Sequence, residues 1–100
     1  MRVRFFAYLR NITGCAEADI PYEETIGLLA RSLCNRYGDK LRQKIFPSVD
    51  SHKKEKPGGE QFGKEIIILI NGRHVSHLGG PGAPLSPDDR VDVFPVVAGG

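Results

Sequence analysis

The sequence has few of the residues that build metal clusters and disulfide frameworks. Its 100 residues include only two cysteines, Cys15 and Cys34. Such a pair makes neither a zinc knuckle nor the set of disulfides that stabilises many small secreted proteins. The net charge is only +2. That is too small for a dedicated nucleic-acid binder, in which basic residues form a stripe with aromatic residues between them. We therefore expect no nucleic acid among the partners.

Long apolar runs are also lacking. The longest are far too short to cross a bilayer, and the N-terminal segment carries Arg2 and Arg4 inside an alternating pattern, unlike a signal peptide. We therefore expect no membrane contact and a cytoplasmic location. Hydrophobic residues make up 40% of the chain and charged residues 26%, a composition typical of a folded protein. The length fits a single domain over residues 1–100, with no room for two lobes around a substrate.

The N-terminal third predicts a pair of strands. Residues 2–10 alternate between apolar and other side chains, with Val3, Phe5, Ala7 and Leu9 on the face turned to the core. Residues 11–14 form a turn in this interpretation, and residues 16–22 form a second strand antiparallel to the first.

A helix follows. Thr25 is a favourable N-cap, the apolar residues from Ile26 to Tyr37 recur at helical spacing, and Gly38 suits the C-cap. Residues 39–46 predict a further helical stretch with Leu41 and Ile45 facing inward. Pro47 then ends it.

The second half predicts a long loop and more strands. Residues 48–63 are polar, without periodicity, and typical of a loop. Glu65 to Ile70 is almost wholly apolar, which predicts a central strand covered on both faces. Asn71-Gly72 predicts a hairpin, and Arg90 to Phe94 a last strand that Pro95 ends. The order of elements predicts an α+β domain, with a mixed sheet packed on one main helix.

Three aromatic residues fall on the sheet face that the alternation assigns to solvent: Phe6, Tyr8 and Phe94. If the first and last strands are neighbours, these rings form one exposed patch, which on small proteins usually marks a docking surface. The residues expected at its rim are Arg4, Arg10 and Asp92. The alternative is that the segment after Pro47, or a different strand register, covers the rings.

The C-terminus, residues 95–100, is expected to be a flexible tail. Its side chains shrink toward the end, through the series Pro95, Val96, Val97, Ala98, Gly99 and Gly100. An extended tail of this length reaches roughly 20 Å. Since it carries no reactive side chain, any chemistry must occur at the terminal carboxylate of Gly100. Two glycines suit a tail that enters a narrow tunnel, because nearby atoms can approach the backbone closely. The alternative is a frayed end without a role.

Several segments in this order resemble the MoaD/ThiS-type sulfur carriers, and most of all the small subunit of molybdopterin synthase. They are residues 3–10 with Gly14, residues 25–29, Ile70 to Arg73, residues 85–91 and residues 94–100. The resemblance covers nearly the whole chain except residues 48–63. It implies the ubiquitin-like β-grasp fold.

The resemblance also implies a function. In this family an ATP-dependent, ubiquitin-activating-like adenylyltransferase activates the terminal glycine, and a sulfur donor converts its carboxylate to a thiocarboxylate. Gly99 and Gly100 would carry this chemistry, and Phe6, Tyr8, Phe94 and residues 95–98 would bind partners. The large subunit of molybdopterin synthase would receive the sulfur. The carrier would have no active site and no permanently bound cofactor, since ATP is used by the activating enzyme.

Other functions remain open. The chain could serve as a ubiquitin-like protein modifier, as a sulfur carrier for thiamine, tRNA thiolation or cysteine, or as an interaction module with an inert tail. We expect no metal site, because His52, His74 and His77 lack a well-placed cysteine or acid beside them. Cys15 and Cys34 are expected to be a turn residue and a core residue, not nucleophiles.

Overall fold

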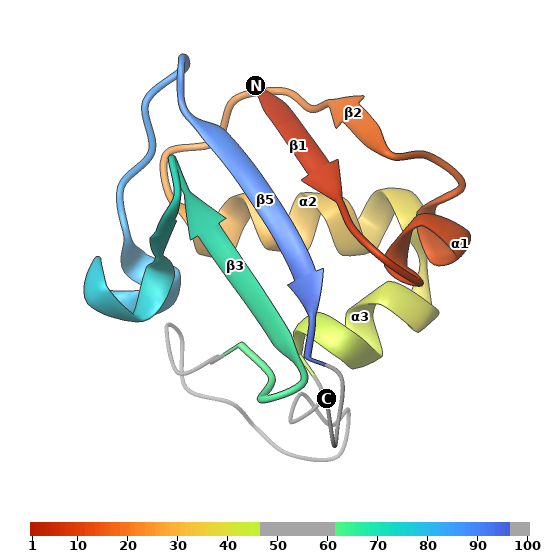
Figure 1. Cartoon of the computed structure of the whole chain (residues 1–100). Coiled ribbons are helices and arrows are strands. Elements are labelled where there is room, and N and C mark those ends of the chain that lie inside the picture. The colour runs from red at the N-terminus through yellow and green to blue at the C-terminus, as the bar shows by residue number, and fades with distance from the viewer. Residues whose placement is uncertain (47–61, 97–100) are drawn as a thin grey trace.

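The structure is a computed structural model that describes residues 1–46 and 62–96. Five strands form one mixed sheet in the order β2-β1-β5-β3-β4, and α2 crosses one face of it (Figure 1). The strands are β1 (Arg2–Phe5), β2 (Glu17–Asp19), β3 (Ile66–Ile70), β4 (Arg73–His74) and β5 (Arg90–Pro95). The helices are α1 (Leu9–Thr13), α2 (Ile26–Tyr37), α3 (Asp39–Ile45) and the short 3-10 helices η1 (Val75–His77) and η2 (Gly80–Gly82). The expected α+β architecture is confirmed.

The last strand lies in the centre of the sheet. β5 runs parallel to β1, with Arg4 opposite Asp92, and antiparallel to β3, with Ile67 opposite Phe94. The first and last strands are therefore neighbours, which is the condition on which the predicted aromatic patch depended. β1 also pairs antiparallel with β2, as expected, although β2 is only three residues long.

Strand β5 continues through Pro95, whereas the sequence predicted that this proline would end it. Backbone groups of successive strand residues point to opposite neighbours. The amide of Val96 donates to the carbonyl of Glu65 on the β3 side, and the amide of Phe6 donates to the carbonyl of Val93 on the β1 side. The nitrogen of Pro95 therefore faces the β1 side, where β1 has already ended. No donor is needed there, so proline is tolerated.

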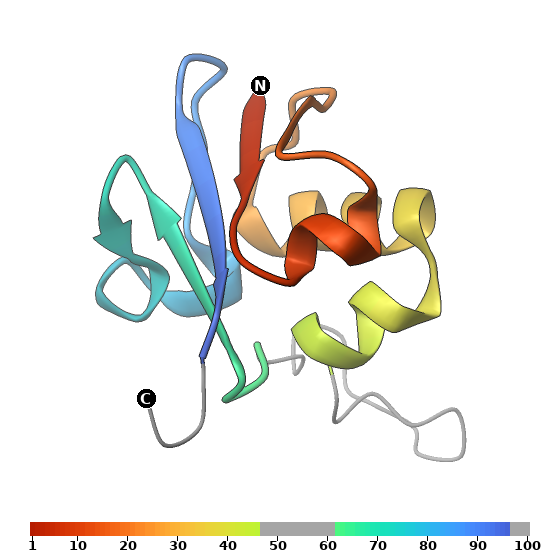
Figure 2. The same ribbon diagram turned by 45° about the vertical axis from the view of Figure 1, so that its right-hand side comes forward.

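The predicted first strand is wrong beyond Phe5. The chain turns at Ala7, whose φ is +55°, and α1 follows directly (Figure 2). Ala7 is exposed instead of facing the core, and Asn11 to Thr13 are helical instead of forming a turn. Leu9 is fully buried as expected, but it lies four residues after Phe5, a spacing that a helical turn serves as well as a strand. The alternation alone could not separate these two solutions.

The predicted main helix is confirmed. The hydroxyl of Thr25 accepts a hydrogen bond from the amide of Leu28 and so caps α2. The second helical stretch is also confirmed as α3, in which Leu41 and Ile45 are fully buried. Together with the inward side chains of the sheet, these helices enclose one core.

Strand β3 is not covered on both faces. Ile66, Ile68 and Ile70 are buried on the α2 side, while Ile67 and Leu69 are only half-buried on the other. Within residues 1–46 and 62–96, the helices pack on one face of the sheet, so an unbroken apolar run did not require a second covering layer. The predicted loop lies outside the described residues except for Phe62 and Gly63, and the tail does so from Val97 onward.

Candidate functional site: the outer face of the sheet

Two aromatic rings stack on the face of the sheet opposite α2. The centroids of Phe6 and Phe94 lie 4.1 Å apart, and the planes are only 9° from parallel. Phe94 comes from β5, and Phe6 follows directly after β1. Parallel pairing places Phe5 opposite Val93. The residues that follow them, Phe6 and Phe94, therefore both direct their rings to the outer face. Both residues stay partly exposed. Phe6 and Phe94 thus lie together on the outer face, as the sequence interpretation expected if the first and last strands were neighbours.

An ion pair lies beside this stack. The Nε and one terminal nitrogen of Arg4 donate to the two carboxylate oxygens of Asp92 at 2.7 and 2.9 Å. Asp92 is only 4% exposed, because Arg4 and Arg90 lie over it. The hydrogen bond to Asp92 raises the pKa of Arg4. Asp92 was expected at an exposed rim and is instead buried beneath the arginines. Its negative charge is paired with them and is not exposed to a partner.

Cations surround the ring of Phe6. The guanidinium carbons of Arg4 and Arg10 lie 5.4 and 5.9 Å from its centroid, within the range of a cation–π interaction. The Nε of Arg10 donates to the carbonyl of Phe5 at 3.1 Å, which holds the guanidinium in place. The expected positions of Arg4 and Arg10 around the aromatic patch are confirmed.

Tyr8 lies elsewhere than predicted. It is the residue that precedes α1 and is 38% exposed, so it belongs to the turn and not to a strand face. The Nζ of Lys44 lies 5.5 Å from its ring centroid and 3.3 Å from a carboxylate oxygen of Glu65. The hydrogen bond to Glu65 raises the pKa of Lys44. Tyr8 therefore contacts Lys44 and does not join the stack of Phe6 and Phe94.

Strand β3 adds two apolar residues that the sequence interpretation missed. Ile67 pairs with Phe94 and Leu69 with Asp92, so both share the outer face with the aromatic stack. The signal was present in the apolar run, but that run was interpreted as buried on both faces. We call Phe6, Phe94, Ile67 and Leu69 the outer apolar patch.

The tail leaves the sheet beside this patch. Pro95 is the last residue of β5 and pairs with Ile66, and the amide of Val96 donates to the carbonyl of Glu65 at 2.8 Å. Val96 is 41% exposed. The other predicted tail residues, Val97, Ala98, Gly99 and Gly100, lie outside the described residues. The first tail residues are therefore anchored next to the outer apolar patch.

The cysteine and histidine side chains lie in surroundings typical of structural residues. The thiol of Cys34 is buried, and burial raises its pKa to about 11. The sulfur of Cys15 lies 3.6 Å from the hydroxyl of Tyr37. The rings of His74 and His77 are 6.2 Å apart, while His52 lies outside the described residues. Among residues 1–46 and 62–96, no three His, Cys, Asp or Glu side chains group as metal ligands do.

The helices described are also unsuited to a bilayer: in the ranges 1–46 and 62–96, none combines the length and apolar character needed to span one. What the site offers instead is an apolar face rimmed by cations, with the exposed Val96 at its border. Such a surface can bind another protein.

Comparison with known proteins defines the class. Residues 3–100 match the ThiS family, and the chain belongs to this family of ubiquitin-like sulfur carriers. It is 33% identical over 102 residues to small archaeal modifier protein 3 of Haloferax volcanii, covering 100% of this chain and 98% of that protein.

Solved structures agree on the fold. Small archaeal modifier protein 1 from Methanosarcina acetivorans aligns with a TM-score of 0.83 and 30% identity, over 99% of this chain and 94% of that one. A putative molybdopterin converting factor, subunit 1, from Pyrococcus furiosus aligns with a TM-score of 0.64 and 23% identity, over 96% and 95%. The sheet packed on α2 is thus the ubiquitin-like β-grasp expected from the sequence.

Proposed function

We propose that this protein carries sulfur as a thiocarboxylate on Gly100 and delivers it in molybdopterin biosynthesis, as the small subunit of molybdopterin synthase. Membership of the ThiS family supports the sulfur chemistry. The observation that carries the proposal is the position of the tail, which starts at Val96 beside the outer apolar patch. A partner that binds the patch receives the tail at a fixed starting point.

The chemistry needs no side chain of this protein. A carboxylate is ionised at pH 7 and is a poor electrophile. ATP, used by an adenylyltransferase, converts the Gly100 carboxylate to an acyl-adenylate and releases pyrophosphate. A sulfide equivalent then attacks the acyl carbon, AMP leaves, and a thiocarboxylate remains. This product is a good sulfur nucleophile toward the next acceptor. We expect these steps to take place in the cytoplasm.

The outer apolar patch would supply the affinity. Ordering a tail residue costs about 1–2 kcal/mol, and glycine loses more conformational freedom than any other residue. Burial of one Phe side chain contributes roughly 1.5–3 kcal/mol. The stacked rings of Phe6 and Phe94 therefore offset part of the cost of ordering residues 97–100 in a partner's active site. The partners in this proposal are the adenylyltransferase and the large subunit of molybdopterin synthase.

Deletion of Gly100 tests the chemistry. The full chain, incubated with the adenylyltransferase, ATP and sulfide, should gain the mass difference between oxygen and sulfur in an intact-mass spectrum. The truncated chain should keep the fold and stay unloaded. Normal sulfur loading of the truncated chain would refute the proposal.

Phe6→Asp tests docking. It places a charge in the patch and should weaken binding of the large subunit by roughly tenfold or more. Leu28→Asp is the matched control, because Leu28 is 45% exposed on α2, away from the patch. Equal binding by both variants would exclude the patch as the docking surface.

A second candidate function is protein modification. The relatives at 33% and 30% identity are both named small archaeal modifier proteins. A modifier would form an isopeptide bond between the carbonyl carbon of Gly100 and a lysine amine, again with loss of AMP from the adenylate. A ladder of protein conjugates that disappears on deletion of Gly100 would support this function. The two functions share the activation step and are separated by the final acceptor.

A further inference from the structure

Strand β3 has an edge that is only partly paired. It pairs with β5 along its whole length, from Ile66 to Ile70, but with β4 only at Leu69 and Ile70. The chain leaves β4 as η1 begins at Val75. In the part of the chain that the structure describes, no strand lies beside Ile66, Ile67 and Ile68 on that side.

Backbone groups of β3 point out at this edge. The amide of Asn71 donates to the carbonyl of Arg90, and the carbonyl of Glu65 accepts from Val96. Backbone groups of odd-numbered residues therefore face β5, and those of Ile66 and Ile68 face the opposite edge. The amide of Ile66 already donates to the carbonyl of Gly63 at 3.4 Å. Among residues 1–46 and 62–96, no strand pairs with the carbonyl of Ile66 or the amide of Ile68.

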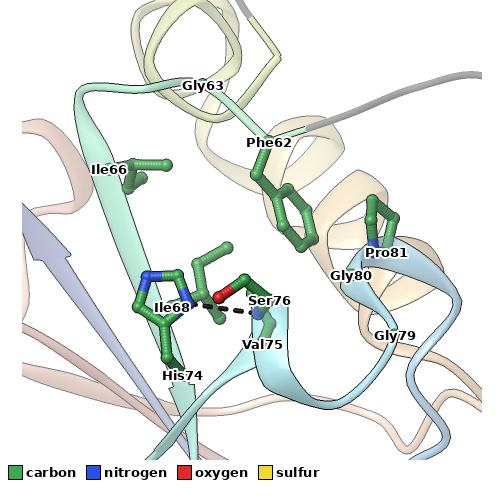
Figure 3. Close-up of a pocket in the computed structure, with 10 residues that line it drawn as sticks. All are labelled: Phe62, Gly63, Ile66, Ile68, His74, Val75, Ser76, Gly79, Gly80 and Pro81. Carbon is green, nitrogen blue, oxygen red and sulfur yellow. Dashed lines mark hydrogen bonds between the residues drawn. The ribbon is translucent and has the colours of Figure 1, made fainter.

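A groove runs along the same edge (Figure 3). Its volume is about 400 Å³, within the usual range of ligand sites. The side chains of Ile66 and Ile68 form one wall, and Phe62 and Pro81 lie across from them. A strand added to the edge of β3 would place alternate side chains in this groove, because successive side chains of a strand point to opposite faces.

Cationic side chains lie at both ends of β3, and at the Asn71 end the carboxylate of Asp89 accepts a hydrogen bond from the Asn71 side chain. None of the described residues that line the groove is acidic. Lys64 is exposed just before β3, and Arg73 is exposed just after the hairpin at the other end of that strand. Glu65 is the nearest acid along the chain, and it pairs with Lys44. A segment with negative charges at its ends complements this arrangement.

We propose that the edge of β3 at residues 66–68 binds an extended peptide of a partner protein, which has apolar residues at alternate positions and acidic residues at its ends. The peptide adds a strand to the sheet, with its backbone bonded to the Ile66 carbonyl and the Ile68 amide. Two apolar side chains occupy the groove between Ile68 and Phe62. The groove lies on the α2 side of β3, and Ile67 is the one residue of this segment that also belongs to the outer apolar patch on the other face. The inference does not depend on the function proposed for the tail.

Titration of the full ¹⁵N-labelled chain with a synthetic peptide tests this inference. The probe is the end-blocked peptide Glu-Val-Ile-Val-Ile-Glu-Glu. We expect saturable amide shifts centred on residues 66–70, with a dissociation constant below about 1 mM. The same peptide with proline in place of its central valine should bind roughly tenfold more weakly, since proline lacks the amide donor and disrupts the strand.

Two variants of the protein locate the site. Ser76→Trp fills the groove from an exposed position. It should abolish the shifts, while the other amide signals keep the dispersion of a folded protein. The double change of Lys64→Glu and Arg73→Glu should weaken binding about five- to tenfold at low salt. Arg36→Glu with Lys40→Glu makes the same change in charge at exposed positions of α2 and α3 and should leave binding nearly unchanged.

Three outcomes would overturn the inference. The first is an Ile68 amide that does not shift at 1 mM peptide, which would mean that binding is weaker than about −4 kcal/mol. The second is a set of shifts centred on Phe6 and Phe94, which would assign the peptide to the outer apolar patch. The third is a shift of the β3 amides with protein concentration alone, which would assign the edge to a second copy of this chain. Failure here would leave sulfur loading of Gly100 untouched.

Discussion

Gly27 on α2 lies directly against the backbone of Pro81 in η2. A Cβ atom at residue 27 would come within 2.7 Å of the carbonyl oxygen of Pro81. The next contact along the helix start, a hydrogen bond from the amide of Ile26 to the carbonyl of Ala83 at 3.0 Å, keeps the two segments together. The absence of a side chain at Gly27 therefore sets how closely η2 approaches α2.

Gly27→Ala should accordingly destabilise the fold. Relief of the clash requires movement of backbone atoms, and overpacking of this kind costs about 1–3 kcal/mol. Gly82→Ala is the matched control, because a Cβ there has open space and no neighbour within 4 Å. Urea unfolding should show a lower midpoint for Gly27→Ala and little change for Gly82→Ala. Equal midpoints would contradict the tight contact.

The ion pair of Arg4 with Asp92 should matter more than the exposed pair on the neighbouring strands. Arg4→Met leaves the 4% exposed carboxylate of Asp92 with Arg90 alone, whose nearest contact is 3.5 Å. We expect a lower melting temperature, by roughly 5 °C. Arg2→Met is the control, since Arg2 and Glu17 are 4.0 Å apart and both more than half exposed. A fall of the same size in both variants would show that Asp92 gains nothing specific from Arg4.

Asn71 should be required at the β3–β4 hairpin for its side chain as well as its backbone. Its φ is +52°, and its side chain both donates to Asp89 at 2.8 Å and accepts from the amide of Arg90 at 2.9 Å. Asn71→Ala loses both bonds and should cost about 1–2 kcal/mol in the free energy of unfolding. Asn71→Gly relieves the backbone but restores neither bond, so it should recover only part of that loss. Full recovery in Asn71→Gly would contradict a role for the amide side chain.

Alkaline pH should weaken the fold through two weak acids, the buried Cys34 and the half-buried Tyr37. Burial raises the pKa of Cys34 from 9.0 to about 11 and that of Tyr37 from 10.0 to about 12. Both groups are held neutral in the folded chain, so they ionise more easily when it unfolds. Their contribution is complete below pH 9 and is lost as the pH rises toward 11 and 12.

Tyr37→Phe separates the two contributions. It keeps the ring that contacts Phe5 edge-on at 5.5 Å and removes the titrating hydroxyl. The free energy of unfolding, measured in urea between pH 8 and about pH 11, should fall less steeply in this variant above pH 10. A wild-type slope in Tyr37→Phe would mean that Tyr37 does not contribute to the alkaline loss.

Elements that rest on one strong local signal were predictable from sequence. The cap at Thr25, the Asn71-Gly72 hairpin and the alternation of Val91 and Val93 appear in the structure as expected. The side-by-side placement of Phe6 and Phe94 also followed, since it required only that β1 and β5 be neighbours.

Features decided by tertiary context were not predictable in this way. The alternation of residues 2–10 fits a strand, but Leu9 reaches the core just as well from α1. The apolar run of β3 hid Ile67 and Leu69 from the predicted patch, because composition does not tell which face a layer covers. Pro95 could remain in β5 only because β1 turns away at Ala7, which no local pattern encodes.

The central position of β5 has a mechanical consequence. Its neighbours β1 and β3 bond to it on both sides, and Pro95 lies at its downstream end. A force applied there along the strand loads both ladders of hydrogen bonds simultaneously in shear, whereas a pull on an edge strand would open its bonds one after another. A partner that pulls on the Pro95 end of β5 therefore meets the resistance of both ladders and does not separate the strands one hydrogen bond at a time.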